Sequence, residues 1–161
     1  PAAVKDGKDL AARGQVLIAA TLGGAAFSNA QVGLIHAIAH TIGARHGVHH
    51  GTANAIAMPY VIKFNNATVA ARYRAVAEAM GVDVRGMSDE AGGVKAAETI
   101  YAFNKQIGLP VSFKEVGVPE ADLEACADAV ISDGAIVYNA KPVMDPAEVL
   151  PVLKAAWAGT L

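Results

Sequence analysis

The chain has 161 residues, which is the size of one domain and enough to bury a hydrophobic core. Hydrophobic residues make up 53% of it and charged residues 17%, and its mean hydropathy is +0.34. A formal net charge of −2 gives no basic surface for nucleic acid or for an anionic membrane. The apolar runs are interrupted before the ~20 residues that a membrane-spanning helix needs. We therefore expect neither a nucleic-acid nor a membrane partner.

Cysteine usage and the first residues indicate the compartment. Cys126 is the only cysteine, so the chain has no disulfide framework. Lys5, Asp6, Lys8 and Asp9 alternate in sign where a signal peptide would need a charged and then an apolar segment. These features predict a cytoplasmic protein.

The residue pattern is a succession of helices separated by glycine, proline and asparagine. Asp9, Asn29, Ser88 and Asp145 are expected helix N-caps, because a short polar side chain can accept a hydrogen bond from the first turn. The helices predicted in this way cover residues 10–22, 30–42, 52–64, 67–80, 89–107 and 120–133, and a last one begins at residue 146.

Glycine and proline set the expected breaks between these helices. Gly23-Gly24 is expected to end the first helix, Gly43 to cap the second, and Pro59 to kink or break the third. Residues 111–113 and 135–138 carry weak strand signals that are too short for a sheet. The sequence therefore predicts one all-α, multi-helix domain over residues 1–161.

All five histidines of the chain fall between His36 and His50. His36 and His40 are four residues apart on a predicted helix, so both imidazoles lie on one face and can reach one metal ion. Such a pair alone is more often solvated or satisfied in the core. His50 follows a glycine-containing loop that can turn back over the face carrying His36, whereas His46 and His49 are expected to be exposed. The window therefore predicts a metal or proton-transfer site.

A hydrolytic zinc site is a second interpretation of the same window. His36, His40, Gly43 and His46 match the spacing H-x-x-x-H-x-x-G-x-x-H of the metzincin proteases. The glutamate that activates water in those enzymes is replaced by Ala37, which cannot accept a proton. A stand-alone metal-binding module or degenerate zinc hydrolase thus remains an alternative, and a non-catalytic helical interaction domain is a third.

The window also resembles a known family. Residues 33–40 (GLIHAIAH), Gly43 and residues 50–59 (HGTANAIAMP) closely resemble the motif of the iron-containing (group III) alcohol dehydrogenases. Similar residues of that family also stand at further positions, namely Arg13, 23–29, Asn65, Met80-Gly81, Gly108-Leu109-Pro110, Asn139 and Trp157. The resemblance spans nearly the whole chain and implies the C-terminal helical domain of that family, with a dehydroquinate synthase-like fold.

The resemblance also implies residue roles. The residues that match His36 and His50 are two of the four protein ligands of the catalytic metal, Fe(2+) or Zn(2+). The residue that matches His40 is not a ligand; it lies beside the nicotinamide and the substrate and handles a proton. Phe27 matches an aromatic residue near the same pocket. His49 stands where the family often has proline, a departure that concerns the loop.

The remaining parts of such an enzyme are absent from this sequence. The family's other two ligands, an Asp and a His at D-x-x-x-H spacing, and its NAD(P)-binding domain match no segment here, and Gly23-Gly24 follows no strand that could begin a phosphate-binding turn. We therefore expect the C-terminal metal-binding part of an oxidoreductase that interconverts an alcohol and an aldehyde or ketone. Its expected partners are its own N-terminal domain and further copies of itself. The high apolar content fits a face covered by that domain.

Overall fold

A computed structural model describes residues 1–161, which form α-helices and short 3-10 helices without a β-strand. The all-α prediction is therefore confirmed. The chain divides into two compact units, residues Pro1–Val32 and Gly33–Leu161. The candidate histidines all belong to the second unit.

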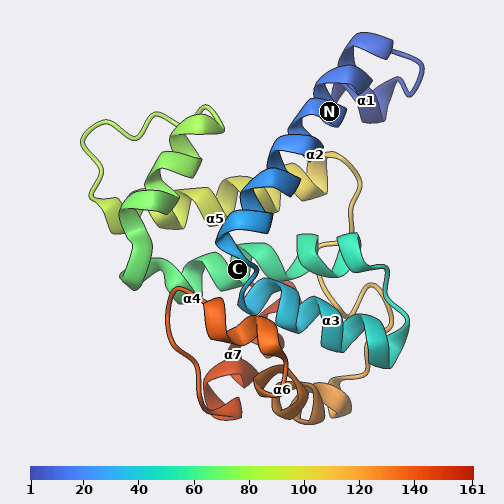
Figure 1. Ribbon diagram of the computed structural model, residues 1–161, viewed down its shortest axis with the longest axis vertical. Helices are drawn as coiled ribbons and strands as arrows, with labels where there is room; N and C mark the ends of the chain where they lie inside the picture. The colour runs from blue at the N-terminus through green and yellow to red at the C-terminus, as the bar shows by residue number, and fades with distance from the viewer. The chain divides into compact units, whose positions relative to one another are not determined.

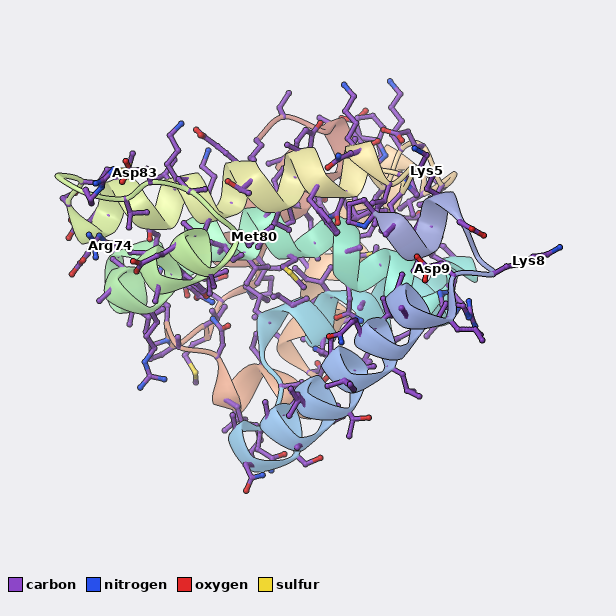
Figure 2. The ribbon with its side chains drawn as sticks, turned by 90° about the horizontal axis from the view of Figure 1, so that it is seen from above. Lys5, Lys8, Asp9, Arg74, Met80 and Asp83 are labelled. Atoms are coloured by element: carbon purple, nitrogen blue, oxygen red, sulfur yellow. The ribbon has the colours of Figure 1, made fainter.

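The first unit consists of α1 (Ala2–Lys5) and α2 (Leu10–Ala30). The side chain of Asp9 caps α2 as predicted, accepting a hydrogen bond from the backbone N–H of Ala12 at 3.0 Å. Figure 2 shows Lys8 in the turn that joins the two helices. The predicted break at Gly23-Gly24 is wrong, and α2 ends instead at Ala30, followed by Gln31 with a φ of 64°. A helical glycine costs only about 1 kcal/mol relative to alanine, so an alanine-rich helix tolerates two.

Because α2 is uninterrupted, its 21 residues are long and apolar enough to cross a membrane, with a mean hydropathy of 1.3. The expectation of short, interrupted apolar runs is thereby corrected for this helix. Length and composition alone are weak evidence for a membrane span, since a core helix of a larger soluble protein also meets them. None of the residues of α2 is buried.

The second unit contains the remaining helices of the fold (Figure 1). They are α3 (Leu34–His46), α4 (His50–Ala79), α5 (Asp89–Gln106), α6 (Leu123–Ile131) and α7 (Pro146–Ala158), with 3-10 helices η1 (Glu120–Asp122) and η2 (Gly134–Tyr138). α4 packs along α5, and α3 packs against α4, α6 and η2. Leu34, Ile38 and Ile42 follow one face of α3 into the main core, which also buries Phe113 and Leu153.

Pro59 lies inside α4 without ending it. A proline cannot donate to the carbonyl four residues earlier, so the carbonyl of Ala55 needs another partner. The side-chain amide of Asn104 on α5 donates to that oxygen at 2.8 Å. The helix bends instead at Val69, where φ is −135° and ψ is 32°, so the predicted break between residues 64 and 67 is displaced by a few residues.

The cap predicted at Asn29 is wrong: Asn29 lies inside α2, where its side chain donates to the carbonyl of Ala25 at 2.8 Å, and α3 begins only at Leu34. The predicted helix 120–133 is the 3-10 turn η1 followed by the shorter α6.

Two other predicted caps are confirmed. Ser88 and Asp145 cap α5 and α7 through hydrogen bonds to Ala91 N and Ala147 N. The segment with a strand signal at 135–138 lies inside η2. Arg74 donates to the carbonyl of Val84 at 3.0 Å, which holds the connection between α4 and α5 (Figure 2).

A pair of asparagines joins three parts of the second unit. Asn139, just after η2, exchanges two hydrogen bonds with Asn65 of α4, at 2.8 and 3.0 Å. Its Oδ1 also accepts from the backbone N–H of Leu34, the first residue of α3. A Cβ at position 33 would lie 3.1 Å from Asn139, so the close approach at Gly33 favours glycine there.

We predict that Asn139→Ala lowers the free energy of unfolding by about 2 to 4 kcal/mol, because it leaves the amide of Asn65 and the N–H of Leu34 without partners. Denaturant unfolding followed by circular dichroism measures this difference. Ser132→Ala is the matched control, since Ser132 is exposed in the same segment and should change stability by at most about 0.5 kcal/mol. Equal stabilities of the two variants would contradict the prediction.

Candidate metal centre

Three of the five histidines converge in the second unit. The ring centres of His36 and His50 lie 5.3 Å apart, those of His40 and His50 5.5 Å, and those of His36 and His40 5.8 Å. The rings of His40 and His50 are nearly parallel, at 17°. The predicted clustering of these three residues is therefore what the structure shows.

The path of the chain explains this convergence. His36 and His40 lie one turn apart on α3, and α3 ends at Gly47, whose φ of 68° is the left-handed conformation that favours glycine. The loop then runs back along α3, so that the carbonyl of Val48 would lie 3.3 Å from a Cβ at position 43. Gly43 is thus not the helix cap that the sequence predicted. It allows the returning loop to approach α3 before α4 begins at His50.

The distance between His36 and His50 suits a shared metal ion. Two imidazoles that bind one tetrahedral metal through bonds of about 2.0–2.1 Å have ring centres roughly 5 Å apart. No group of three or more His, Cys, Asp or Glu side chains in this chain is arranged to hold a metal. The two residues therefore fit half of a ligand set that further ligands would have to complete.

Hydrogen bonds define the state of His50. The side-chain amide of Asn54 donates to His50 Nε2 at 3.0 Å and also to the His50 carbonyl at 3.0 Å. Nε2 is then the unprotonated nitrogen, and its lone pair is used by the hydrogen bond from Asn54, which a metal ion bound there would have to replace. The Oδ1 atom of Asn54 is buried and has no hydrogen-bond partner.

The surroundings of His36 favour its neutral form. Burial lowers its pKa from the ordinary value of 6.5, and the neighbouring His50 and His40 lower it further, whereas Asp133 acts in the opposite direction. A neutral imidazole is the form that binds a metal ion.

His40 has a partner that sequence reasoning did not identify. Its Nδ1–H donates to Oδ2 of Asp133 at 2.9 Å, and the two side chains are 43% and 22% exposed. Asp133 is 93 residues further along the chain and precedes η2. Only its ability to cap a turn is visible in the sequence, and that property gives no indication of a histidine partner.

The other two histidines lie outside this cluster. His46 is only 11% exposed, with its Nε2 3.7 Å from Cys126 Sγ and 3.9 Å from Asp122, so its predicted exposure is wrong. Its side chain faces η1 and α6, and the structure does not assemble the zinc-hydrolase set of His36, His40 and His46. His49 is exposed as predicted.

Two further predictions concern single residues. Phe27 lies on α2 in the first unit and is 54% exposed, so its place near a nicotinamide stays a prediction. Cys126 is fully buried, as expected of a small core residue.

Comparison with known proteins gives consistent matches. Residues 1–157 match the family described as Fe-containing alcohol dehydrogenase family, C-terminal. Lactaldehyde reductase of Escherichia coli K12 is 41% identical over 110 residues, which are 68% of this chain and 29% of that protein. NAD-dependent methanol dehydrogenase of Bacillus methanolicus is 34% identical over 152 residues, 93% of this chain and 40% of that protein.

The fold is shared with solved structures as well. A crystal structure of 1,3-propanediol oxidoreductase superimposes with a TM-score of 0.92 at 32% identity, covering 96% of this chain and 40% of that chain. The chain thus spans 29–40% of the length of these relatives. The prediction of a C-terminal helical domain is confirmed by the matched family and by this fold.

The lowered pKa of His36 predicts a pH-dependent stability of the metal-free protein. The folded chain binds this proton less readily than the unfolded chain. The contribution of His36 to the free energy of unfolding is therefore fully present above pH 6.5, the ordinary pKa. It is lost as the pH falls from there towards the lowered pKa of the folded chain. Denaturant titrations between about pH 7 and pH 5 should show a shallower fall for His36→Gln than for the wild type. His49→Gln, at an exposed histidine, is the control, and equal slopes for all three proteins would contradict the prediction.

Proposed function

Because the chain belongs to the Fe-containing alcohol dehydrogenase family, we propose that it is the metal-binding part of an oxidoreductase that interconverts an alcohol and an aldehyde or ketone with NAD(P). The observation that carries this proposal is the convergence of His36, His40 and His50, with ring centres 5.3–5.8 Å apart. These are the three histidines to which the family resemblance assigns roles.

His36 and His50 are the proposed ligands of Fe(2+) or Zn(2+), since imidazole suits both metals. A metal held there would supply Lewis-acid chemistry, lowering the pKa of an alcohol that binds to it. The lowered pKa of His36 supports this assignment, because it favours the neutral imidazole that binds a metal ion. At His50, a metal bound through Nε2 would replace the hydrogen bond from Asn54. The remaining ligands would come from a segment outside these residues.

His40 is the proposed proton-handling residue. Its Nδ1 is engaged with Asp133, so its Nε2 is the nitrogen available for exchange with a substrate. Its side chain is 43% exposed, which gives the ring access to solvent. NAD(P) would be held mainly by an N-terminal domain, with Phe27 contributing to the nicotinamide pocket.

The same proposal includes a cytoplasmic homo-oligomer with small-molecule alcohol and aldehyde substrates. α2 lies within the residues that match the family, 1–157, and the matched structure covers 96% of the chain. This match favours a place for α2 in the folded enzyme rather than in a membrane.

The test uses the intact protein and compares metal affinity with alcohol-dependent reduction of NAD(P)+. We expect His36→Ala and His50→Ala each to weaken metal binding by at least roughly 100-fold and to abolish turnover, because a lost ligand costs more than the 10- to 100-fold typical of a lost supporting residue. His46→Ala is the matched control and should leave metal affinity nearly unchanged. A large loss with His46→Ala would favour the hydrolase interpretation, and a wild-type protein without alcohol-dependent turnover would contradict the proposal.

Residues 1–161 alone should bind a divalent metal weakly and show no dehydrogenase activity, because the chain has at most two of the four expected ligands. Isothermal titration with Zn(2+) and an assay with NAD(P)+ and simple alcohols measure both properties. Tight metal binding or appreciable alcohol oxidation by this chain alone would overturn that expectation.

A further inference from the structure

We propose that Asp133 is a positioning residue that holds His40 in the Nδ1–H tautomer, so that Nε2 keeps its lone pair for the proton released from the alcohol. The inference rests on the proposed function of His40 and goes beyond it by assigning a role to a residue distant in sequence. In the oxidation, the O–H and C–H bonds of the alcohol break, the hydride reduces NAD(P)+, and the proton passes to His40 Nε2.

The contact itself fixes the tautomer. A carboxylate only accepts hydrogen bonds, so the nitrogen that lies 2.9 Å from Asp133 Oδ2 must carry a hydrogen. In a neutral imidazole the hydrogen is then on Nδ1, and Nε2 is the acceptor. Without the carboxylate, both tautomers of a half-exposed histidine are accessible, and one of them cannot take a proton at Nε2.

The carboxylate is itself held in place. Its second oxygen, Oδ1, accepts from the backbone N–H of Ala135 at 2.8 Å and caps η2. At the other end of η2, Asn139 accepts from Leu34 N at the start of α3. The η2 segment is thus attached to the helix that carries His40 at two points, which orients Asp133 towards the imidazole.

The pair also reaches solvent. His40 and Asp133 line an open hollow of about 340 Å³ together with Thr41, Arg45 and Ser132. Water in such a hollow can exchange protons with the pair. The 43% exposure of His40 means that an ion pair here adds little to stability, so a role in orienting the ring explains the contact better than a role in folding.

Asp133→Asn separates these two roles. Asparagine caps turns about as well as aspartate, so a purely structural residue would tolerate the change. An amide, however, has one acceptor oxygen for two donors, Ala135 N–H and His40 Nδ1–H. The backbone N–H of Ala135 can only donate, whereas the imidazole can move its proton from Nδ1 to Nε2. His40 should therefore shift to the Nε2–H tautomer, in which Nε2 donates and cannot accept the proton of the alcohol.

The experiment uses the intact protein and two readouts. Steady-state kinetics with the metal-loaded protein should show that Asp133→Asn lowers kcat by roughly 10- to 100-fold with little change in KM. In metal-free protein labelled with 15N-histidine, NMR shifts should show His40 as Nδ1–H in the wild type and mainly Nε2–H in the variant. A His40→Ala spectrum assigns the signal.

Asp122→Asn is the matched control, because it removes the same charge 3.9 Å from His46 and should leave both readouts at wild-type values. Unchanged thermal unfolding of Asp133→Asn would show that the fold is retained. Wild-type kcat and an unchanged His40 tautomer in Asp133→Asn would overturn the inference. A wild-type protein without alcohol oxidation would instead overturn the proposed function, and the tautomer readout would still decide whether Asp133 positions His40.

Discussion

The return of the chain along α3 is the constraint on which the histidine cluster depends. His36 and His40 are adjacent because helical periodicity makes them so, but His50 can join them only if the loop turns back at once. Gly47 supplies the left-handed turn and Gly43 allows the carbonyl of Val48 to approach α3. The two glycines thus act on the geometry of the site without touching an imidazole, and a side chain at either position would disturb the approach of His50.

The η2 segment provides the second fixed point. It carries Asp133 at its start and Asn139 just after its end, and the two side chains contact α3 about one helical turn and a half apart, at His40 and at Leu34. Asn139 also binds Asn65, so α4 is held in the same arrangement. These hydrogen bonds therefore couple the packing of α3, α4 and η2 to the orientation of one imidazole, in addition to the apolar core that the three elements share.

Much of this structure is predictable from local chemistry. The caps at Asp9, Ser88 and Asp145 follow from the polar side chain before an apolar-periodic run, and the three histidines follow from spacing and resemblance. The errors arise where a distant residue changes a local rule. Pro59 does not break α4 because Asn104 satisfies the freed carbonyl of Ala55.

The site shows the same division between local and distant effects. The helical spacing of His36 and His40 is local, whereas the partner of His40 is 93 residues away and no pattern near it indicates a histidine. The burial of His46 beside Cys126 is likewise set by the packing of α6. Tertiary contacts of this kind cannot be obtained from one sequence by periodicity and capping alone.

The electrostatics of the histidine cluster favour the metal site that we propose. Burial lowers the pKa of His36, and the neighbouring His50 and His40, with ring centres 5.3 and 5.8 Å away, lower it further. Neutral imidazoles gain a favourable partner when a cation binds, but two of them leave its charge uncompensated. A carboxylate among the remaining ligands would supply that compensation, whereas the carboxylate of Asp133 is engaged with His40 and with the backbone N–H of Ala135. The cluster thus offers imidazoles to the proposed metal ion, and further ligands would be needed to complete that site.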